Sequence, residues 1–240
     1  MHEGKELEDQ DIQLPKHMRC ATHTLNLIAT TDYKNTVTKI PAIRAREKNA
    51  FSKCVQLWKK SNKPKSNEII IKLLGNTLSS PGATGYGTPL LMPFRRFLKQ
   101  KKNFQLCNKK ETELLYLEEY CLVMKPLAST LDLLQGEDNV SFGYLLPSLI
   151  SLINKYEKLL AQTKLKYGGE HLAKMCIKSL NTRFANILNL EWEDPIIAAV
   201  LLPKFKLKWY NAVKNLKNYR RYKKMHYNCR QNKNGIGKLQ

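Results

Sequence analysis

Cys20 and His23 have the residue types and the spacing that come nearest to a metal site in this sequence. Positions i and i+3 share one face of a helix, where a thiolate and an imidazole can bind the same zinc ion. A structural zinc site needs four donors, and only His17 lies nearby. We therefore favour a packed histidine, or one that lies beside DNA, over a zinc site. We expect no metal and no other cofactor.

Other catalytic patterns are missing or weak. The sequence has none of the motifs G-x-G-x-x-G, G-x-x-x-x-G-K-[ST], H-E-x-x-H or G-x-S-x-G. The glycines of residues 82–87 (GATGYG) lack the lysine that follows in a phosphate-binding loop. Glu118-Glu119 and Glu137-Asp138 are adjacent pairs, whose side chains do not share a helix face. We expect them to be solvated carboxylates rather than an acid–base pair. We also expect that the protein is not an enzyme.

Basic side chains are concentrated in two blocks. The 240 residues hold 41 Lys and Arg against 20 Asp and Glu, which gives a net charge of +21. Residues 39–110 carry 17 basic and two acidic side chains, and residues 204–240 carry 12 basic and no acidic ones. Such blocks attract polyanions and release counterions from nucleic acid. Each block is equally compatible with a solvated basic face that has no specific partner.

Aromatic residues alternate with lysines and arginines in the second block, a pattern that suits stacking on nucleic-acid bases. Four apolar residues there fall at helical spacing, however, which favours the buried face of an amphipathic helix. They are Phe205, Trp209, Val213 and Leu216. Residues 220–224 (RRYKK) also resemble a nuclear-import patch, so we expect a nuclear protein.

The composition is that of a globular protein. Apolar residues make up 42% of the chain, and its length allows one or two domains with a sizeable core. No stretch approaches the roughly 20 apolar residues of a membrane span, and we expect no membrane partner. The first ten residues lack the apolar centre of a secretory signal. The six cysteines form no C-x-x-C pair, which favours reduced thiols in an intracellular protein.

Hydrophobic periodicity predicts a mainly α protein. Its first half is expected to begin with a short helix from residue 19 that ends at Thr30-Thr31-Asp32. A longer helix is predicted over residues 42–60, a strand or a helix at residues 68–74, and a basic helix at residues 94–102. The packed residues of the longer helix are expected to be Ala45, Phe51, Val55 and Trp58.

The second half has a clearer apolar pattern. Apolar residues recur every three or four positions over residues 114–134, 145–160 and 172–187, which predicts three packed helices. Gly168-Gly169 is expected to end the second of them. Asp194 is a candidate N-cap for a further helix that Pro195 opens.

Four segments, in the same order along the chain, resemble blocks of hAT-superfamily transposases and their zinc-finger BED-domain relatives. Residues 14–30 (LPKHMRCATHTLNLIAT) are similar to the C-x-x-H segment of that family. Residues 117–127 (LEEYCLVMKPL) and 133–140 (LLQGEDNV) resemble the helices of its insertion domain, and residues 198–206 (AAVLLPKFK) a later Pro-Arg/Lys-Phe-Lys run. The family's Thr-Arg-Trp-Asn-Ser motif is represented by residues 84–88 (TGYGT), which lack its Arg and Trp.

The resemblance implies a ribonuclease-H-like core interrupted by a helical insertion domain, with three carboxylates that bind divalent metal. In the family pattern the second carboxylate is followed by Ser-Asn, which is true of neither Asp9 nor Asp11. We therefore expect a truncated, catalytically inactive chain, without the BED finger and the dimerisation region. The expected organisation is an acidic disordered lead-in (1–16), a core remnant with a basic connection (17–110), the helical insertion domain (111–216) and a basic tail (217–240).

DNA is the partner that charge and resemblance together predict. Arg19 and His23 are the inherited candidates near DNA. The candidate contacts in the basic blocks are Arg95, Arg96, Lys99, Lys101, Lys102, Arg220, Arg221, Lys223 and Lys224. Two alternatives stay open: a fragment of an active transposase whose catalytic residues lie elsewhere, and a helical module that binds a protein partner or itself through exposed apolar surface.

Overall fold

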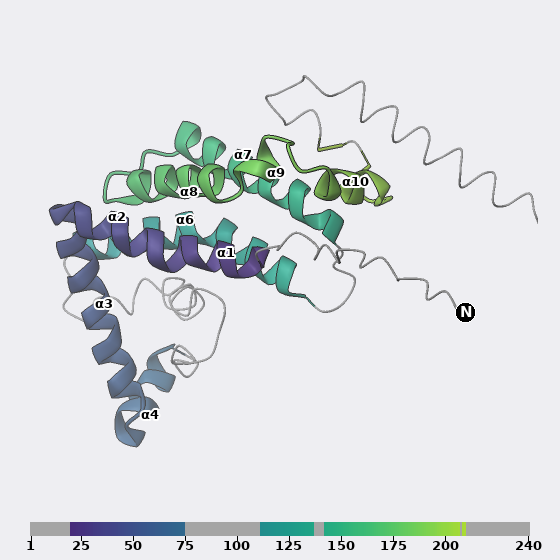
Figure 1. The fold of residues 1–240 in the computed structure, drawn as a ribbon. Helices are drawn as coiled ribbons and strands as arrows, with labels where there is room; N and C mark the ends of the chain where they lie inside the picture. Colours follow the sequence, from purple (N-terminus) through teal and green to yellow (C-terminus); the bar gives the residue numbers. More distant parts are fainter. Residues whose placement is uncertain (1–19, 75–110, 137–141, 207, 210–240) are drawn as a thin grey trace, which may run out of the picture.

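The computed structural model describes residues 20–74, 111–136, 142–206 and 208–209 (Figure 1). Within these ranges the chain forms helices joined by turns and no strand, which confirms the mainly α class. The lead-in predicted for residues 1–16 and the tail predicted for 217–240 lie outside the described residues. So do the basic helix predicted at residues 94–102 and the domain limit after residue 110, which remain predictions.

The first helix is longer than its sequence suggests. α1 (Ala21–Leu27), η1 (Ile28–Asp32) and α2 (Tyr33–Lys39) follow one another without a gap, and η1 is a π-helical turn. The end predicted at Thr30-Thr31-Asp32 is therefore wrong. Side chains are buried every three or four residues through this turn, so burial outweighs the weak helix propensity of Thr and Asp. The buried residues are Leu25, Ile28, Ala29, Tyr33 and Val37.

α3 (Pro41–Ser61) and α4 (Pro64–Leu74) are the next two helices. α3 confirms the helix predicted over residues 42–60, and α4 shows that residues 68–74 are helical. The packed face of α3 is predicted only in part, because Phe51 is partly buried whereas Ala45 and Val55 are exposed. The stripe is set instead by side chains seven and four residues apart. These are Ile43, Ala50 and Cys54, and the side chain of Trp58 lies outside the description.

The central helices agree with the predicted stripes. α6 (Glu111–Gln135) and α7 (Leu145–Gln162) cover the first two, and α8 (Gly169–Arg183) with α9 (Ala185–Leu188) covers the third. A one-turn helix, η4 (Phe142–Tyr144), precedes α7. Pro126 removes one hydrogen bond from the middle of α6, yet the helix continues through it. The carbonyl of Pro126 accepts a hydrogen bond of 2.9 Å from the hydroxyl of Thr130.

Two helix starts differ from the prediction. α7 ends at Gln162, so Gly168-Gly169 does not end it but begins α8. Gly168 has a φ of 138°, a backbone conformation that residues with a Cβ rarely adopt. Asp194 lies in the first turn of α10 (Glu193–Leu201) and is not its N-cap, which is Trp192. Its carboxylate accepts the indole N–H of Trp192 at 2.9 Å.

The aromatic residues after α10 pack as predicted, although not on a helix. Trp209 is buried, and Phe205 is partly buried and packs edge-on against Tyr144, with 4.8 Å between the ring centroids. Residues 203–206 form turns, so the predicted amphipathic helix does not begin there. Val213 and Leu216 lie outside the described residues.

The helices form one body from which an arm extends (Figure 1). α6 is central to the body, where it contacts α1, α3, α7 and α8. The first helical run lies along α6, and α10 packs on η4 and α7 at the end of the body away from α2. α3 leaves the body beside α2 and carries α4 at its far end.

A bidentate ion pair fixes the π turn to α8. The guanidinium of Arg183 donates two hydrogen bonds of 2.7 Å to the carboxylate of Asp32, which lies 151 residues away in sequence. These bonds, together with one from the hydroxyl of Ser179, hold the pKa of Asp32 below its usual range. The next residue, Tyr33, meets the hydroxyl of Tyr116 at 2.9 Å inside the core. The last residue of the π turn and the first residue of α2 thus contact partners in different helices, α8 and α6.

Replacing Asp32 by Asn is expected to destabilise the fold by about 1–2 kcal/mol at neutral pH, because charge-assisted hydrogen bonds are lost. The pKa of Asp32 is lowered on folding, so its contribution is present above the unfolded-state pKa of about 4 and is lost as the pH falls. Urea denaturation at several pH values from 7 to 3 should therefore show that the free energy of unfolding falls more steeply with falling pH for the unmodified chain than for Asp32→Asn.

The exposed pair Glu170–Lys174 supplies the matched control, since its atoms are 2.6 Å apart but both side chains face solvent. Glu170→Gln should change the stability little at any pH. An equal effect of the two substitutions would show that the Asp32–Arg183 pair does not hold the π turn.

Candidate nucleic-acid interface

Of the candidate site residues predicted from the sequence, the structure describes Cys20 and His23. Cys20 is the N-cap residue of α1 and His23 lies in its first turn, and both are exposed. The other candidates lie outside the described residues. They are Arg19, Arg95, Arg96, Lys99, Lys101, Lys102, Arg220, Arg221, Lys223 and Lys224.

The Cys20 thiol has a protein partner rather than a metal-like environment. Its Sγ lies 3.0 Å from the hydroxyl of Thr22, and this hydrogen bond lowers the pKa of the thiol. Among the described residues no group of three or more His, Cys, Asp or Glu side chains could hold a metal ion. The described cysteines are free thiols, and all except Cys20 are buried.

Glu119 is not the solvated carboxylate that its sequence suggests. Its two oxygens accept the backbone N–H groups of Lys166, Tyr167 and Gly169, at 2.6, 2.9 and 2.8 Å. Gly169 is the first residue of α8, and a helix start leaves its N–H groups without partners inside the helix. The carboxylate supplies those partners from α6 and fixes the loop between α7 and α8. Glu119 therefore has a structural role that no local sequence pattern reveals.

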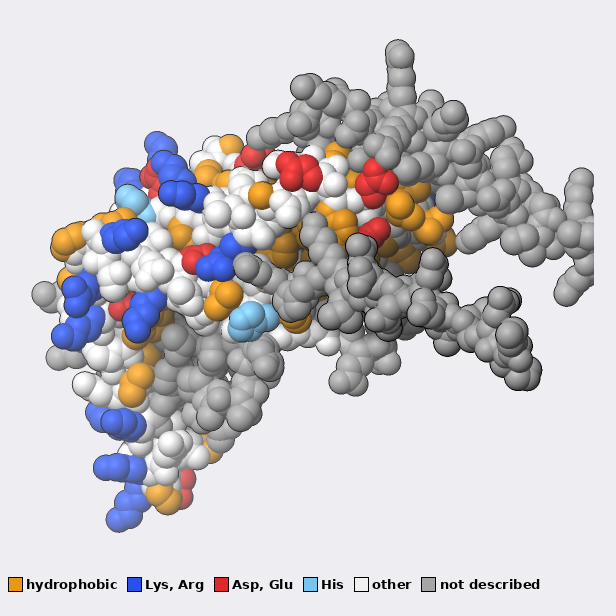
Figure 2. All heavy atoms as spheres, in the orientation of Figure 1, with side chains coloured by type: hydrophobic (Ala, Val, Ile, Leu, Met, Phe, Trp, Pro, Cys, Tyr) orange, Lys and Arg blue, Asp and Glu red, His pale blue; other side chains and the backbone are white. Residues whose placement is uncertain are grey.

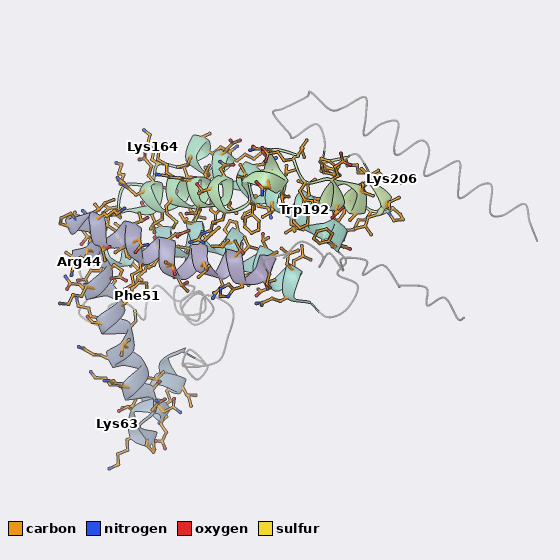
Figure 3. All side chains as sticks on the ribbon, viewed as in Figure 1. Arg44, Phe51, Lys63, Lys164, Trp192 and Lys206 are labelled. Atoms are coloured by element: carbon orange, nitrogen blue, oxygen red, sulfur yellow. The ribbon has the colours of Figure 1, made fainter. Side chains whose placement is uncertain are left out.

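The described half of the first basic block forms a row of cations on the arm. We use the name basic ridge for six residues of α3, α4 and the turn between them that all have exposed side chains. They are Arg44, Lys48, Lys59, Lys60, Lys63 and Lys65. Figure 2 shows basic side chains along the outer edge of the arm, and Figure 3 labels Arg44 near its upper end and Lys63 near its lower end. The ion pairs described for this chain include none of the six.

Helical spacing places three of the six ridge residues in line on α3. Arg44, Lys48 and Lys59 are separated by four and eleven residues, close to one and three full turns, so they share one face of α3. At a rise of about 1.5 Å per residue, Arg44 and Lys59 lie about 22 Å apart along the helix. Ile43, Ala50 and Cys54 occupy the buried side of α3. The cations therefore face away from the body.

Two further basic side chains of α3 anchor the helix to the body. Lys53 makes an ion pair of 2.6 Å with Glu113 of α6, whose residue is only 4% exposed. Arg46, seven residues earlier and so on the same face, donates to the carbonyl of Tyr167 at 3.3 Å and lies 5.8 Å from the centre of its ring. These contacts hold α3 to α6 and to the loop that Glu119 fixes. They determine which way the basic ridge points.

The acidic residues of this block leave the ridge largely uncompensated. Glu47 is half-buried, and its burial raises the pKa of its carboxyl, while a hydrogen bond with Tyr33 opposes that shift. It therefore belongs to the tyrosine cluster rather than to the ridge. Glu68 is exposed on α4, three residues after Lys65, so it borders the ridge at its last residue.

The ridge residues differ from the bases that the sequence singled out within residues 39–110. Runs such as Arg95-Arg96 and Lys101-Lys102 are conspicuous in a sequence, whereas the ridge consists of lysines and one arginine dispersed over 22 positions. The signal that could have identified it is the spacing of Arg44, Lys48 and Lys59 within the helix predicted over residues 42–60.

No protein-family model, curated protein or solved structure matches this chain. In the part of the chain that the structure describes, no helix has both the length and the apolar composition needed to cross a bilayer.

Lys53→Ala is expected to destabilise the protein by roughly 2–3 kcal/mol, because it leaves the carboxylate of Glu113 buried without a counter-charge. Lys48→Ala removes the same side chain from the exposed face of α3 and should stay within about 0.5 kcal/mol. Urea denaturation of the two variants checks the assignment. Equal stabilities would mean that Lys53 does not anchor the helix.

Proposed function

We propose that this chain is a nucleic-acid-binding protein of hAT-transposase descent that lacks catalytic activity and binds DNA through the basic ridge. The observation that carries the proposal is the ridge itself: six exposed cations on the arm, three of which share one face of α3, with half-buried Glu47 as the acidic residue between the first two. The field of such a row adds up, because its charges repeat on one face and point into solvent. A polyanion with regularly spaced charges is the ligand that fits it.

The fixed orientation of α3 supports a binding role for its basic face over that of a solvated face without a partner. A solvated helix needs no attachment of its own, whereas α3 is held by Lys53 to a buried carboxylate and by Arg46 to a backbone carbonyl. Both contacts lie on the side of α3 away from Arg44, Lys48 and Lys59, whereas Lys60, seven residues after Lys53, lies on the anchor side. They fix the direction of α3 and with it that of Arg44, Lys48 and Lys59, and a preorganised array binds a charged ligand with a smaller loss of conformational entropy.

The proposed ancestry is supported by the order of the resembling segments and by the helices they form. Residues 117–127 and 133–136 lie on or directly after α6, and residues 198–202 lie at the end of α10. A helical insertion domain is expected to be made of such packed helices. The nuclear localisation that we propose with it is based on the basic run at residues 220–224.

A second candidate function, association with a protein or with another copy, is favoured by apolar side chains on the arm. Ile69 is 59% exposed, and Val55 and Ile71 are exposed as well. Isolated exposed apolar residues are common on protein surfaces, and these three lie beside lysines. We therefore rank this function below nucleic-acid binding. Light scattering that shows a monomer across a wide concentration range would argue against self-association.

Replacing Arg44, Lys48 and Lys59 together by Gln is expected to weaken DNA binding and to lower the slope of log K against log salt by about 2–3, since each phosphate contact contributes about 0.9 for duplex DNA. The triple variant Lys155→Gln, Lys158→Gln and Lys178→Gln removes the same charge from exposed positions of α7 and α8. It should keep the original slope. Fluorescence anisotropy over a salt series measures the salt slope of both triple variants. An equal reduction of the slope in the two would show that net charge, not the ridge, governs binding.

The absence of catalysis is tested separately. Because neither Asp9 nor Asp11 is followed by the Ser-Asn of the family pattern, incubation with supercoiled plasmid and Mg²⁺ is expected to leave the DNA intact. Nicking that co-purifies with the chain and disappears on addition of EDTA would contradict this part of the proposal while leaving the binding role unaffected.

A further inference from the structure

We infer that the basic ridge recognises the regular phosphate array of a nucleic-acid duplex and does not read the bases. The inference rests on the proposed function, and it specifies the ligand form and the mode of recognition. Three features of the ridge lead to it: the kind of cation, the kind of side chain that accompanies the cations, and the shape of the row.

The first feature is the predominance of lysine. Five of the six ridge residues are lysines, and Arg44 is the exception. The guanidinium of arginine offers a planar fork that binds guanine edges bidentately, whereas the ammonium group of lysine is a compact point charge on a flexible stem. Arg46 has the fork, but it is already engaged with Tyr167. A row of point charges binds phosphates wherever they occur and carries little sequence information.

The second feature is the placement of the aromatic rings. Binding sites for single strands commonly present exposed aromatic side chains on which the bases stack. Among the side chains described on α2, α3 and α4 the aromatic ones are turned inward: Tyr33 is buried, and Phe51 packs edge-on against Tyr120 at 5.4 Å between ring centres. The described surface of the ridge therefore has no stacking platform.

The third feature is the shape of the row. The ridge follows the outer edge of a projecting helix, and Arg44 and Lys59 span about 22 Å along it. A duplex is stiff over such a length, since its persistence length is about 50 nm, so its phosphates are already ordered. A flexible single strand would first have to be straightened along the edge, at a cost in conformational entropy. The row of Arg44, Lys48 and Lys59 on one helix face therefore fits a duplex better than a single strand.

Fluorescence anisotropy with the full chain and three probes of equal length tests the inference: two duplexes of unrelated sequence and an oligo-dT strand. We expect the two duplexes to bind within about threefold of each other and the single strand to bind more weakly, with a smaller salt slope. Tighter binding of oligo-dT, or a difference of more than about tenfold between the duplexes, would overturn the inference while the proposed function stands. Binding of none of the probes at low salt would overturn the proposed function itself.

Two substitutions at Arg44 provide the sharper comparison. If the ridge uses charge alone, Arg44→Lys should bind both duplexes as the unmodified chain does, whereas Arg44→Gln should lower the salt slope by about 0.9. If Arg44→Lys loses as much affinity as Arg44→Gln, and for one duplex more than for the other, the guanidinium reads a base and the inference is wrong. Both variants leave the anchors of α3 intact, and denaturation curves that coincide with the original confirm that they fold.

Discussion

The carboxylate of Glu113 is buried in α6, and the ammonium group of Lys53 is the counter-charge that makes this burial tolerable. The orientation of the arm depends on this contact. Among the described side chains of α3, the buried ones are Ile43, Ala50, Cys54 and Ser61, with Phe51 partly buried, so packing holds this 21-residue helix along one side. Because an unpaired buried charge costs much more than an exposed one, the ion pair selects one placement of α3 over others with similar apolar contact.

α6 supplies the partners for the other irregular parts of the fold as well. Glu113 meets Lys53 of α3, and Tyr116 meets Tyr33 of α2. Glu119, about one turn after Tyr116, accepts three backbone N–H groups from the loop at the start of α8. That loop presents the carbonyl of Tyr167 to Arg46, so one carboxylate of α6 contributes indirectly to the second anchor of α3. The central helix thus holds the basic arm twice, once directly and once through a loop.

The sequence predicts the features of this fold that local spacing encodes. α6, α7 and α8 follow from apolar residues at every third or fourth position, which identify a buried face wherever the rest of the chain lies. The π turn and the loop before α8 could not be predicted in this way, because Asp32 and Glu119 are stabilised by partners 151 and up to 50 residues away. The basic ridge is an intermediate case: its spacing is local, but only the contact between α3 and α6 shows which side of α3 faces solvent.

The ridge itself works against the fold that positions it. Lys59, Lys60, Lys63 and Lys65 lie within seven residues of chain, and like charges at such separations repel one another. This repulsion acts on the far end of the arm, where the attachment to α6 through Lys53 and Glu113 is more than one turn away. A bound polyanion would remove it and, by binding only the folded array, would stabilise the arm by mass action. If the ridge binds a polyanion as we propose, binding and order in the arm are coupled through the same cations. Salt screens both the repulsion between the lysines and their attraction to the polyanion, so the arm should respond to salt more strongly than the body does.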